Sequence, residues 1–120
     1  MIDSKTRLVC LIGDPVSHSV SPAIHNAAFR ATGLNYVYLA FRVDRARLET
    51  AVDGLRCLGV AGFNVTIPHK VVVLRYLDAL SSEAKEIGAV NTVVNRAGGL
   101  SATTLTRAAP WTPCWTPVLK

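Results

Sequence analysis

The sequence contains no run of apolar residues that could cross a membrane, which would need roughly 18 to 20 in succession. Residues 1–5 also lack the basic and then apolar layout of a secretion signal. The chain has 120 residues, and 50% of them are hydrophobic, which is enough for one compact domain but not for two. We therefore expect one soluble, cytoplasmic domain without a membrane partner.

Cysteine is scarce, with three copies in the chain. Cys10, Cys57 and Cys114 form no C-x-x-C pair, and no histidine stands near them at the spacing of zinc ligands. This spacing argues against a disulfide framework and a metal site. We expect buried free thiols.

Acidic residues are also few, 8 against 13 Lys and Arg, so the formal net charge is +5. A basic chain can bind nucleic acid when its positive side chains gather on one surface. Here they are scattered, and the only cluster is Arg42, Arg45 and Arg47. We therefore expect no nucleic-acid partner.

The residues that are present alternate between short apolar runs and helical patterns. Predicted strands cover residues 7–12, 36–43, 60–65 and 89–94, and predicted helices cover 21–33, 45–58, 68–80 and 81–87. Capping residues support two of the helices, because Ser21 can cap the first with Pro22 at its first position, and Asp44 can cap the second. This alternation predicts an α/β fold, a three-layer α-β-α domain with a mainly parallel sheet.

Ligands of such sheets bind beyond the carboxyl ends of the strands, which indicates residues 13–21, residues 64–70 and the surroundings of Asn91. In the first of these loops, Ser17, Ser19 and Ser21 are spaced by two. Hydroxyls beside a helix N-terminus can hold an anionic or polyhydroxylated ligand, but they can equally be a cap and turn residues. We interpret His18 as a turn residue and His25 as a core histidine.

The second loop, residues 64–70, reads NVTIPHK. Asn64 and Thr66 point the same way if the strand continues through them, because side chains alternate along a strand. Lys70 would then lie on the first turn of the predicted helix 68–80, where the helix dipole disfavours a cation. The residues alone leave two interpretations of Lys70 open, a surface charge and a proton donor.

Three blocks of the sequence together resemble one protein family. GDPVSHSVSPAIHNAAF (residues 13–29), GVAGFNVTIPHK (59–70) and EAKEIGAVNTVV (83–94) are similar to the N-terminal, substrate-binding domain of shikimate dehydrogenases, in the same order. The resemblance implies an α/β substrate domain followed by an NADP-binding Rossmann domain. It also implies the reversible, NADPH-dependent reduction of 3-dehydroshikimate to shikimate, a step of chorismate and aromatic amino-acid biosynthesis.

The resemblance also assigns roles to individual side chains. Ser19 and Ser21 match serines that hydrogen-bond the substrate carboxylate, and Thr66 and Asn91 match residues that bind the ring hydroxyls. Asn64 belongs to the same substrate-binding block in a supporting place. These five residues are the predicted substrate contacts besides Lys70.

Lys70 matches the catalytic lysine of the family. Hydride transfer to a ketone leaves an alkoxide-like oxygen, and a nearby ammonium can stabilise that charge and donate the proton. In the family, this lysine works with an aspartate from a segment of the type L-V-G-x-N-T-D. Here Leu100 is followed by SATTLTR, which contains no acid.

The missing segment has an explanation in the genetic code. One permitted set of codons, with a single base restored after Leu100, encodes Leu-Val-Gly-His-Asn-Thr-Asp-Ala in place of residues 100–107. Our hypothesis is a domain at residues 1–100, incomplete at its C-terminal end, followed by an out-of-frame, disordered tail at residues 101–120. The alternative is a family variant with a divergent tail.

Three expectations follow from this hypothesis. No G-x-G-x-x-G occurs in the chain and the Rossmann domain is absent, so we expect no bound NADP and no activity from this chain alone. Loss of the segment should expose the edge of strand 89–94 and favour self-association.

A quinate/shikimate dehydrogenase relative and a non-catalytic shikimate-binding module remain alternative functions, and NAD or NADP preference stays open.

Overall fold

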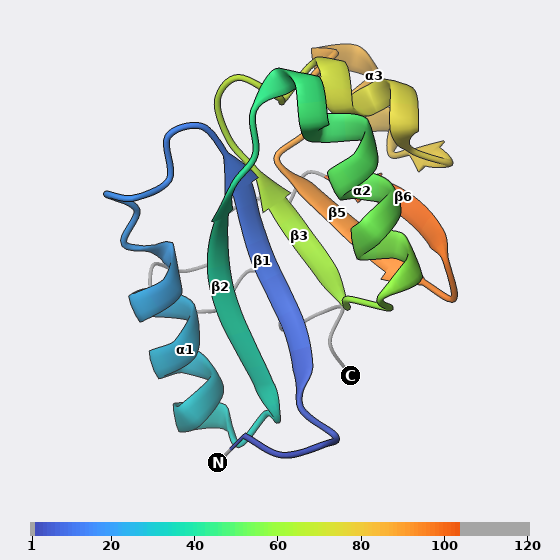
Figure 1. Cartoon of the computed structure of the whole chain (residues 1–120). Coiled ribbons are helices and arrows are strands. Elements are labelled where there is room, and N and C mark those ends of the chain that lie inside the picture. Colours follow the sequence, from blue (N-terminus) through green and yellow to red (C-terminus); the bar gives the residue numbers. More distant parts are fainter. Residues whose placement is uncertain (1, 104–120) are drawn as a thin grey trace.

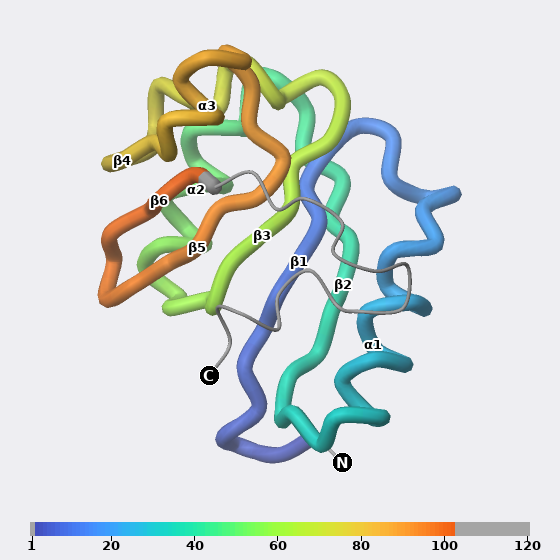
Figure 2. Tube along the Cα trace, turned by 180° about the vertical axis from the view of Figure 1, so that it is seen from behind, coloured from blue at the N-terminus to red at the C-terminus, as the bar shows by residue number. Residues whose placement is uncertain are grey.

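The computed structural model describes residues 2–103 and consists of one six-stranded sheet with helices on both faces. Its elements are β1 (Arg7–Gly13), α1 (Ser21–Thr32), β2 (Tyr36–Arg42), the 3-10 helix η1 (Arg45–Arg47), α2 (Leu48–Cys57), β3 (Gly62–Val65), the 3-10 helix η2 (Val72–Tyr76), β4 (Ala79–Leu80), α3 (Ser82–Ile87), β5 (Thr92–Arg96) and β6 (Gly99–Thr103). Helix α2 crosses in front of the sheet in Figure 1 and lies behind it in Figure 2.

The strands follow the order β2-β1-β3-β5-β6-β4. β1 runs parallel to both β2 and β3, and β4 runs parallel to β6. β5 is antiparallel to its neighbours β3 and β6, and a tight turn at Ala97 and Gly98, both with positive φ, joins it to β6. The predicted α/β fold and the mainly parallel sheet are therefore confirmed, with β5 as the strand that makes the sheet mixed.

Each face of the sheet has its own core. On the α2 face, Leu48 and Val52 of α2 pack with Phe63 and Val93 of the sheet in the larger cluster of buried residues. On the α1 face, Phe29 of α1 packs with Tyr38 and other strand residues in a smaller cluster. The alternation of side chains along β1 supplies both faces, because Val9 and Leu11 belong to the smaller cluster and Cys10 and Ile12 to the larger one.

The predicted caps are partly confirmed. Helix α1 begins at Ser21 itself with Val20 at the N-cap, so the prediction of Ser21 as the cap is wrong by one residue. The hydroxyl oxygen of Ser19 instead accepts the backbone N–H of Ser21 at 3.1 Å. Asp44 does act as a cap, since its carboxylate accepts the backbone N–H of Arg47 at 3.0 Å and begins η1, which leads directly into α2.

The helix predicted at residues 68–80 is wrong. This stretch forms turns, the 3-10 helix η2 and the short strand β4. Residues 71–73 are three successive valines, whose branched side chains lower helix propensity. The end of this stretch hydrogen-bonds to β6 instead of forming a helix, since Asp78 N–H donates to Leu100 O at 2.8 Å and Ser81 N–H to Ala102 O at 3.1 Å. Lys70 therefore does not lie on the first turn of a helix.

The edge of β5 is covered, which corrects the expectation of an exposed strand. β6 pairs with the whole of β5, from Thr92 opposite Thr103 to Arg96 opposite Gly99. Leu100 and Ala102 anchor β6 because both are buried in the core of the α2 face. An exposed edge of β5 therefore does not support the predicted self-association. Residues 101–103 of the predicted tail belong to β6, and residues 104–120 lie outside the described residues.

Of the three predicted buried thiols, the structure describes two. Cys10 is buried, and burial raises the pKa of its thiol to about 12. Cys57 is exposed, so its predicted burial is wrong, and Cys114 lies outside the described residues. Within residues 2–103, no helix is both long and apolar enough to span a membrane, and no cluster of three or more metal-ligating side chains occurs.

Candidate functional site

The three predicted ligand-binding places meet at one end of the sheet, where β1 and β3 end and β5 begins (Figure 1). Backbone hydrogen bonds tie them together: Thr66 N–H to Ile12 O (3.0 Å), Asp14 N–H to Ile67 O (2.8 Å), Val65 N–H to Asn91 O (2.9 Å) and Val90 N–H to Lys70 O (2.9 Å). Because these bonds are main-chain bonds, they place the loops independently of the side chains. We call this region the site end of the sheet.

Gly13 allows Thr66 to lie directly against the end of β1. A Cβ atom on Gly13 would lie 2.2 Å from Thr66 Cγ2 and 3.1 Å from Ile67 O. The first distance is far below any real contact between carbon atoms, so only glycine fits here without a displacement. Gly13 is therefore needed for the position of Thr66, a predicted substrate contact.

Asn64 uses its side-chain amide within the protein. Its Oδ1 accepts a hydrogen bond from Tyr38 OH at 2.8 Å, and its Nδ2 donates to Asn91 O at 3.2 Å and to Thr92 Oγ1 at 3.1 Å. Tyr38 belongs to the core of the α1 face, so Asn64 points to that face, as does Thr66 beside Gly13. The predicted common orientation of Asn64 and Thr66 agrees with these contacts.

Asn91 immediately precedes β5 and has an exposed side chain. Its Oδ1 accepts a hydrogen bond from Thr92 Oγ1 at 2.9 Å. Since β5 is antiparallel to β3, with Asn64 opposite Thr92, the beginning of β5 lies beside the end of β3. This strand direction brings Asn91 to the site end.

The two predicted serines lie at the beginning of α1, and Ser21 is half-buried. Ser19 Oγ accepts the backbone N–H of Ser21, whereas the hydroxyl of Ser21 has no partner within the described part of the chain. Ser21 O lies 2.9 Å from Nδ1 of His25, whose ring stacks on Tyr38 with 4.1 Å between centroids. Burial lowers the pKa of His25, which agrees with its interpretation as a core histidine.

Lys70 is exposed, and its ammonium makes no ion pair with any described residue. The next side chain towards the N-terminus, that of His69, is fully buried, and its Nε2 hydrogen-bonds Val43 O. His69 thereby holds the loop against the residue that follows β2. Sequence reasoning missed this residue and also Tyr38 and Thr92, because their partners lie between 26 and 28 residues away along the chain.

The site end offers hydrogen-bonding groups that the protein does not use itself. Within residues 2–103, no partner is found for the hydroxyls of Ser21 and Thr66, the Nδ2 of Asn91 or the ammonium of Lys70. Hydroxyl and amide groups can bind hydroxyls or a carboxylate, and an ammonium binds a carboxylate, hydroxyl or carbonyl oxygen. The arrangement therefore suits a small ligand that is rich in oxygen.

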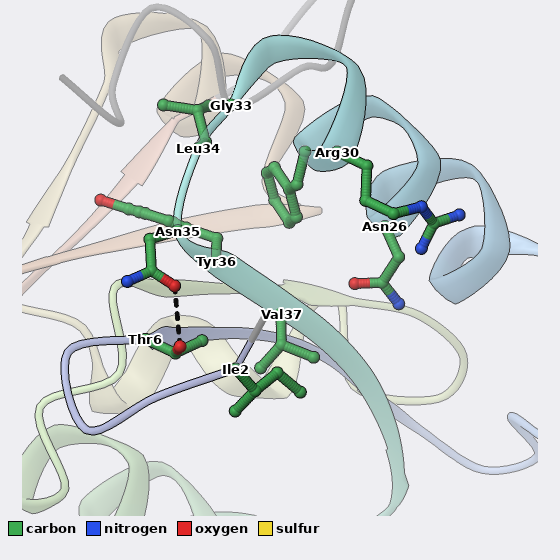
Figure 3. Close-up of a pocket in the computed structure, with 10 residues that line it drawn as sticks. Ile2, Thr6, Asn26, Arg30, Gly33, Leu34, Asn35, Tyr36 and Val37 are labelled. Carbon is green, nitrogen blue, oxygen red and sulfur yellow. Dashed lines mark hydrogen bonds between the residues drawn. The ribbon is translucent and has the colours of Figure 1, made fainter.

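A hollow of about 550 Å³ lies at the opposite end of α1, between that helix, the beginning of β2 and the N-terminal segment (Figure 3). Two of its polar side chains are bonded to each other, since Thr6 Oγ1 donates to Asn35 Oδ1 at 2.7 Å, and Asn35 Nδ2 also donates to Asp3 Oδ1 at 3.1 Å. These hydrogen bonds also lower the pKa of Asp3, first through Asn35. Because the sequence motifs lie at the other end of α1, we place the candidate site at the site end.

Comparisons with known proteins indicate one family. Residues 11–93 match the family described as the shikimate dehydrogenase substrate binding domain. The NADP(+)-dependent shikimate dehydrogenase of Thermococcus kodakarensis is 55% identical over 104 residues, which are 87% of this chain and 38% of the relative. That of Methanopyrus kandleri is 60% identical over 92 residues, which are 77% of this chain and 32% of the relative.

Solved structures give the same result. The crystal structure of shikimate 5-dehydrogenase from Listeria monocytogenes, in complex with shikimate and NAD, is 48% identical and has a TM-score of 0.82. The match covers 84% of this chain and 35% of that structure, so the chain spans about a third of the length of its relatives. Because the family match extends over more than half of its residues, the chain belongs to the shikimate dehydrogenase substrate-binding domain family.

Proposed function

We propose that the chain is the substrate-binding part of an NADP-dependent shikimate dehydrogenase and binds shikimate or 3-dehydroshikimate at the site end. The observation that carries this proposal is the set of unused hydrogen-bonding groups there, on Ser21, Thr66, Lys70 and Asn91. These groups come from three separate segments that the main chain holds together. A cyclic acid with several hydroxyls needs such a convergent set of donors and acceptors.

The proposed ligand contacts are assigned to the side chains of the site end. Ser19 and Ser21 bind the carboxylate, which is favourable at the beginning of α1 because backbone N–H groups and the helix dipole point there. Thr66 and Asn91 bind ring hydroxyls. Asn64, whose amide is bonded to Tyr38, Asn91 and Thr92, acts by supporting Asn91.

Lys70 is the proposed catalytic residue. An exposed ammonium without an ion pair among residues 2–103 can approach the reacting oxygen, stabilise the charge that develops on it and donate a proton. The aspartate that assists the lysine in the family would come from the segment after Leu100. No acid occurs in residues 101–120, and residues 104–120 lie outside the described part of the chain.

NADP does not fit this chain. The cofactor supplies hydride in the reaction, and its pyrophosphate is usually held by a glycine-rich turn between a strand and a helix. The turn between β1 and α1 carries Pro15 and the serines instead, and the sequence has no G-x-G-x-x-G. The proposal therefore assigns the cofactor to the part of the relatives that this chain does not cover.

Titration with shikimate tests the binding proposal. We expect saturable shifts of backbone amide resonances in residues 13–21, 64–70 and around Asn91, and a parallel titration with quinate compares the two ring acids. Lys70→Met should weaken binding about tenfold or more, because it removes a charged hydrogen-bond donor. Lys5→Met is the matched control at the other end of the sheet and should bind as wild type; no saturable shift in any titration contradicts the proposal.

Two further measurements address the chain as a whole. We expect no NADP-dependent oxidation of shikimate by the purified chain, and measurable turnover would contradict that expectation. Sequencing the gene from the codon of Leu100 onward tests the frameshift hypothesis, which fails if no frame encodes V-G-x-N-T-D. The proposal includes a cytoplasmic location.

A further inference from the structure

We propose that a one-way chain of hydrogen bonds from Tyr38 through Asn64 and Thr92 fixes the side-chain amide of Asn91 with its NH₂ group towards the ligand. In this arrangement Tyr38, Asn64 and Thr92 are positioning residues, and Asn91 alone of the four touches the ligand. The inference deepens the proposed function and rests on it for the identity of the ligand. The direction of the hydrogen bonds follows from the donors and acceptors of the chain itself.

The orientation of the Asn64 amide is determined by Asn91 O. A backbone carbonyl can only accept, so the group that faces it at 3.2 Å must be the NH₂ of Asn64. The oxygen of the same amide then faces Tyr38 OH at 2.8 Å. Because an amide oxygen can only accept, Tyr38 must be the donor in this pair.

Thr92 continues the chain of hydrogen bonds in the same donor-to-acceptor direction. Its Oγ1 accepts one hydrogen of Asn64 Nδ2 at 3.1 Å, so the single hydroxyl proton of Thr92 must go to another acceptor. That acceptor is Asn91 Oδ1, at 2.9 Å. The oxygen of the Asn91 amide is thereby bound inside the protein, and its NH₂ group has no partner among the described residues.

The consequence is a specificity rule for the ligand. The NH₂ group that Asn91 presents can only donate, so the ligand atom opposite this group must have a lone pair, as a hydroxyl or carbonyl oxygen does. An ammonium at that position would meet only donors and would be rejected. Such selection is strong in a closed site, because a wrong partner leaves a polar group without a hydrogen bond.

The first residue of this chain of hydrogen bonds is rigidly held. Tyr38 is 0% exposed, and Asn26 of α1 bonds both polar groups of its backbone, accepting from Tyr38 N–H at 2.8 Å and donating to Tyr38 O at 2.9 Å. His25 stacks on the ring of Tyr38. The same helix carries Ser21 at its beginning, so α1 positions one predicted contact directly and Asn91 through Tyr38.

Two pairs of variants test the inference on the 120-residue chain. Thr92→Val removes the hydroxyl with little change of shape, and Thr92→Ser restores it. Tyr38→Phe removes the first donor, and Tyr36→Phe makes the same change two positions away, where no hydrogen bond of the hydroxyl is found among the described residues. The readouts are the side-chain amide resonances of Asn91 and the affinity for shikimate.

We expect Thr92→Val and Tyr38→Phe to shift the Asn91 side-chain resonances and to weaken shikimate binding about fivefold to tenfold. Thr92→Ser and Tyr36→Phe should stay within about twofold of wild type. Unmoved Asn91 resonances in Thr92→Val, or equal effects of Tyr36→Phe and Tyr38→Phe, would overturn the inference. If wild type binds no shikimate, the proposed function fails, but the resonances of Asn91 still decide whether the hydrogen bonds orient it.

Discussion

The two faces of the sheet differ in what they contain. Among residues 2–103, the α2 face buries 15 hydrophobic residues in one cluster, whereas the cluster on the α1 face has 6. On the α1 face, Tyr38 donates a hydrogen bond to Asn64 and its ring stacks on that of His25. Within the described part of the chain, the α2 face therefore holds the larger hydrophobic core, and the α1 face carries the hydrogen bonds that lead to the site.

Replacement of Phe63 by alanine should have the largest effect. Phe63 is 0% exposed in the core of the α2 face, and truncation of a buried phenylalanine costs about 3 to 5 kcal/mol. Urea unfolding followed by circular dichroism measures the loss. Tyr38→Phe is the comparison on the α1 face and should cost about 1 kcal/mol, because it removes one hydrogen bond and little volume. Equal losses in the two variants would contradict the division of roles between the faces.

Elements that depend on local signals could be predicted from the sequence. β1, α1, β2 and α2 occur close to their predicted positions because apolar periodicity, Pro22, Gly33 and Asp44 act within a few residues. The stop at Gly33 is an example, since its φ of 71° is a conformation that glycine adopts without strain. Such signals do not require knowledge of the rest of the fold.

The antiparallel direction of β5 could not be predicted. The reason is the helix at residues 68–80, which the sequence pattern predicted and the structure does not contain. That helix would have carried the chain back along the sheet, as a parallel strand requires. Without that helix, α3 is the only α-helix described between β3 and β5. The six residues of α3 span about 9 Å, which is too short for a crossover connection. The chain therefore stays near the site end and enters β5 there, which brings Asn91 beside Val65.

The candidate site could be predicted only in part, because some of its residues lie in recognisable segments and others depend on the strand order. Ser21, Thr66, Asn91 and Lys70, whose polar groups have no partner among residues 2–103, lie in segments that the sequence patterns and the family resemblance indicate. The positioning residues depend on the strand order β2-β1-β3, which places Tyr38 within reach of Asn64 across β1. No pattern in the sequence connects two residues that are 26 positions apart.

Addition of one methyl group at two glycines should affect the two faces in opposite directions. Gly13→Ala places a carbon 2.2 Å from Thr66 Cγ2 and should destabilise the chain by about 1 to 3 kcal/mol through overpacking. It should also weaken shikimate binding, because Thr66 must move. Gly54 lies in α2, where an added methyl group would meet open space, so Gly54→Ala should stabilise by about 0.5 to 1 kcal/mol.

Thermal unfolding and the shikimate titration measure both glycine variants. Gly54→Ala also serves as the control for binding, since α2 packs on the opposite face and its affinity for shikimate should equal that of wild type. If Gly13→Ala is as stable as wild type and binds normally, the close approach of Thr66 to β1 does not matter for the site. If Gly54→Ala destabilises the chain, the methyl group does not have the space that the structure shows.

The smallest expected effect is a pH dependence that comes from the α1 face. Burial lowers the pKa of His25 below its ordinary value of 6.5, so the unfolded chain binds this proton more readily than the folded chain. The stability that neutral His25 contributes is therefore present above about pH 6.5 and is lost as the pH falls through the lower pKa of the folded state. His25→Phe keeps a ring against Tyr38 and removes the ionisable group.

The difference in melting temperature between about pH 7.5 and about pH 5 should consequently be smaller in His25→Phe than in wild type. The effect is small because His25 is only half-buried and solvent reduces the penalty of its charge. His18→Gln is the control, since His18 is exposed in the turn before α1 and should leave the pH dependence unchanged. An unaltered difference in His25→Phe would show that protonation of this ring does not destabilise the α1 face.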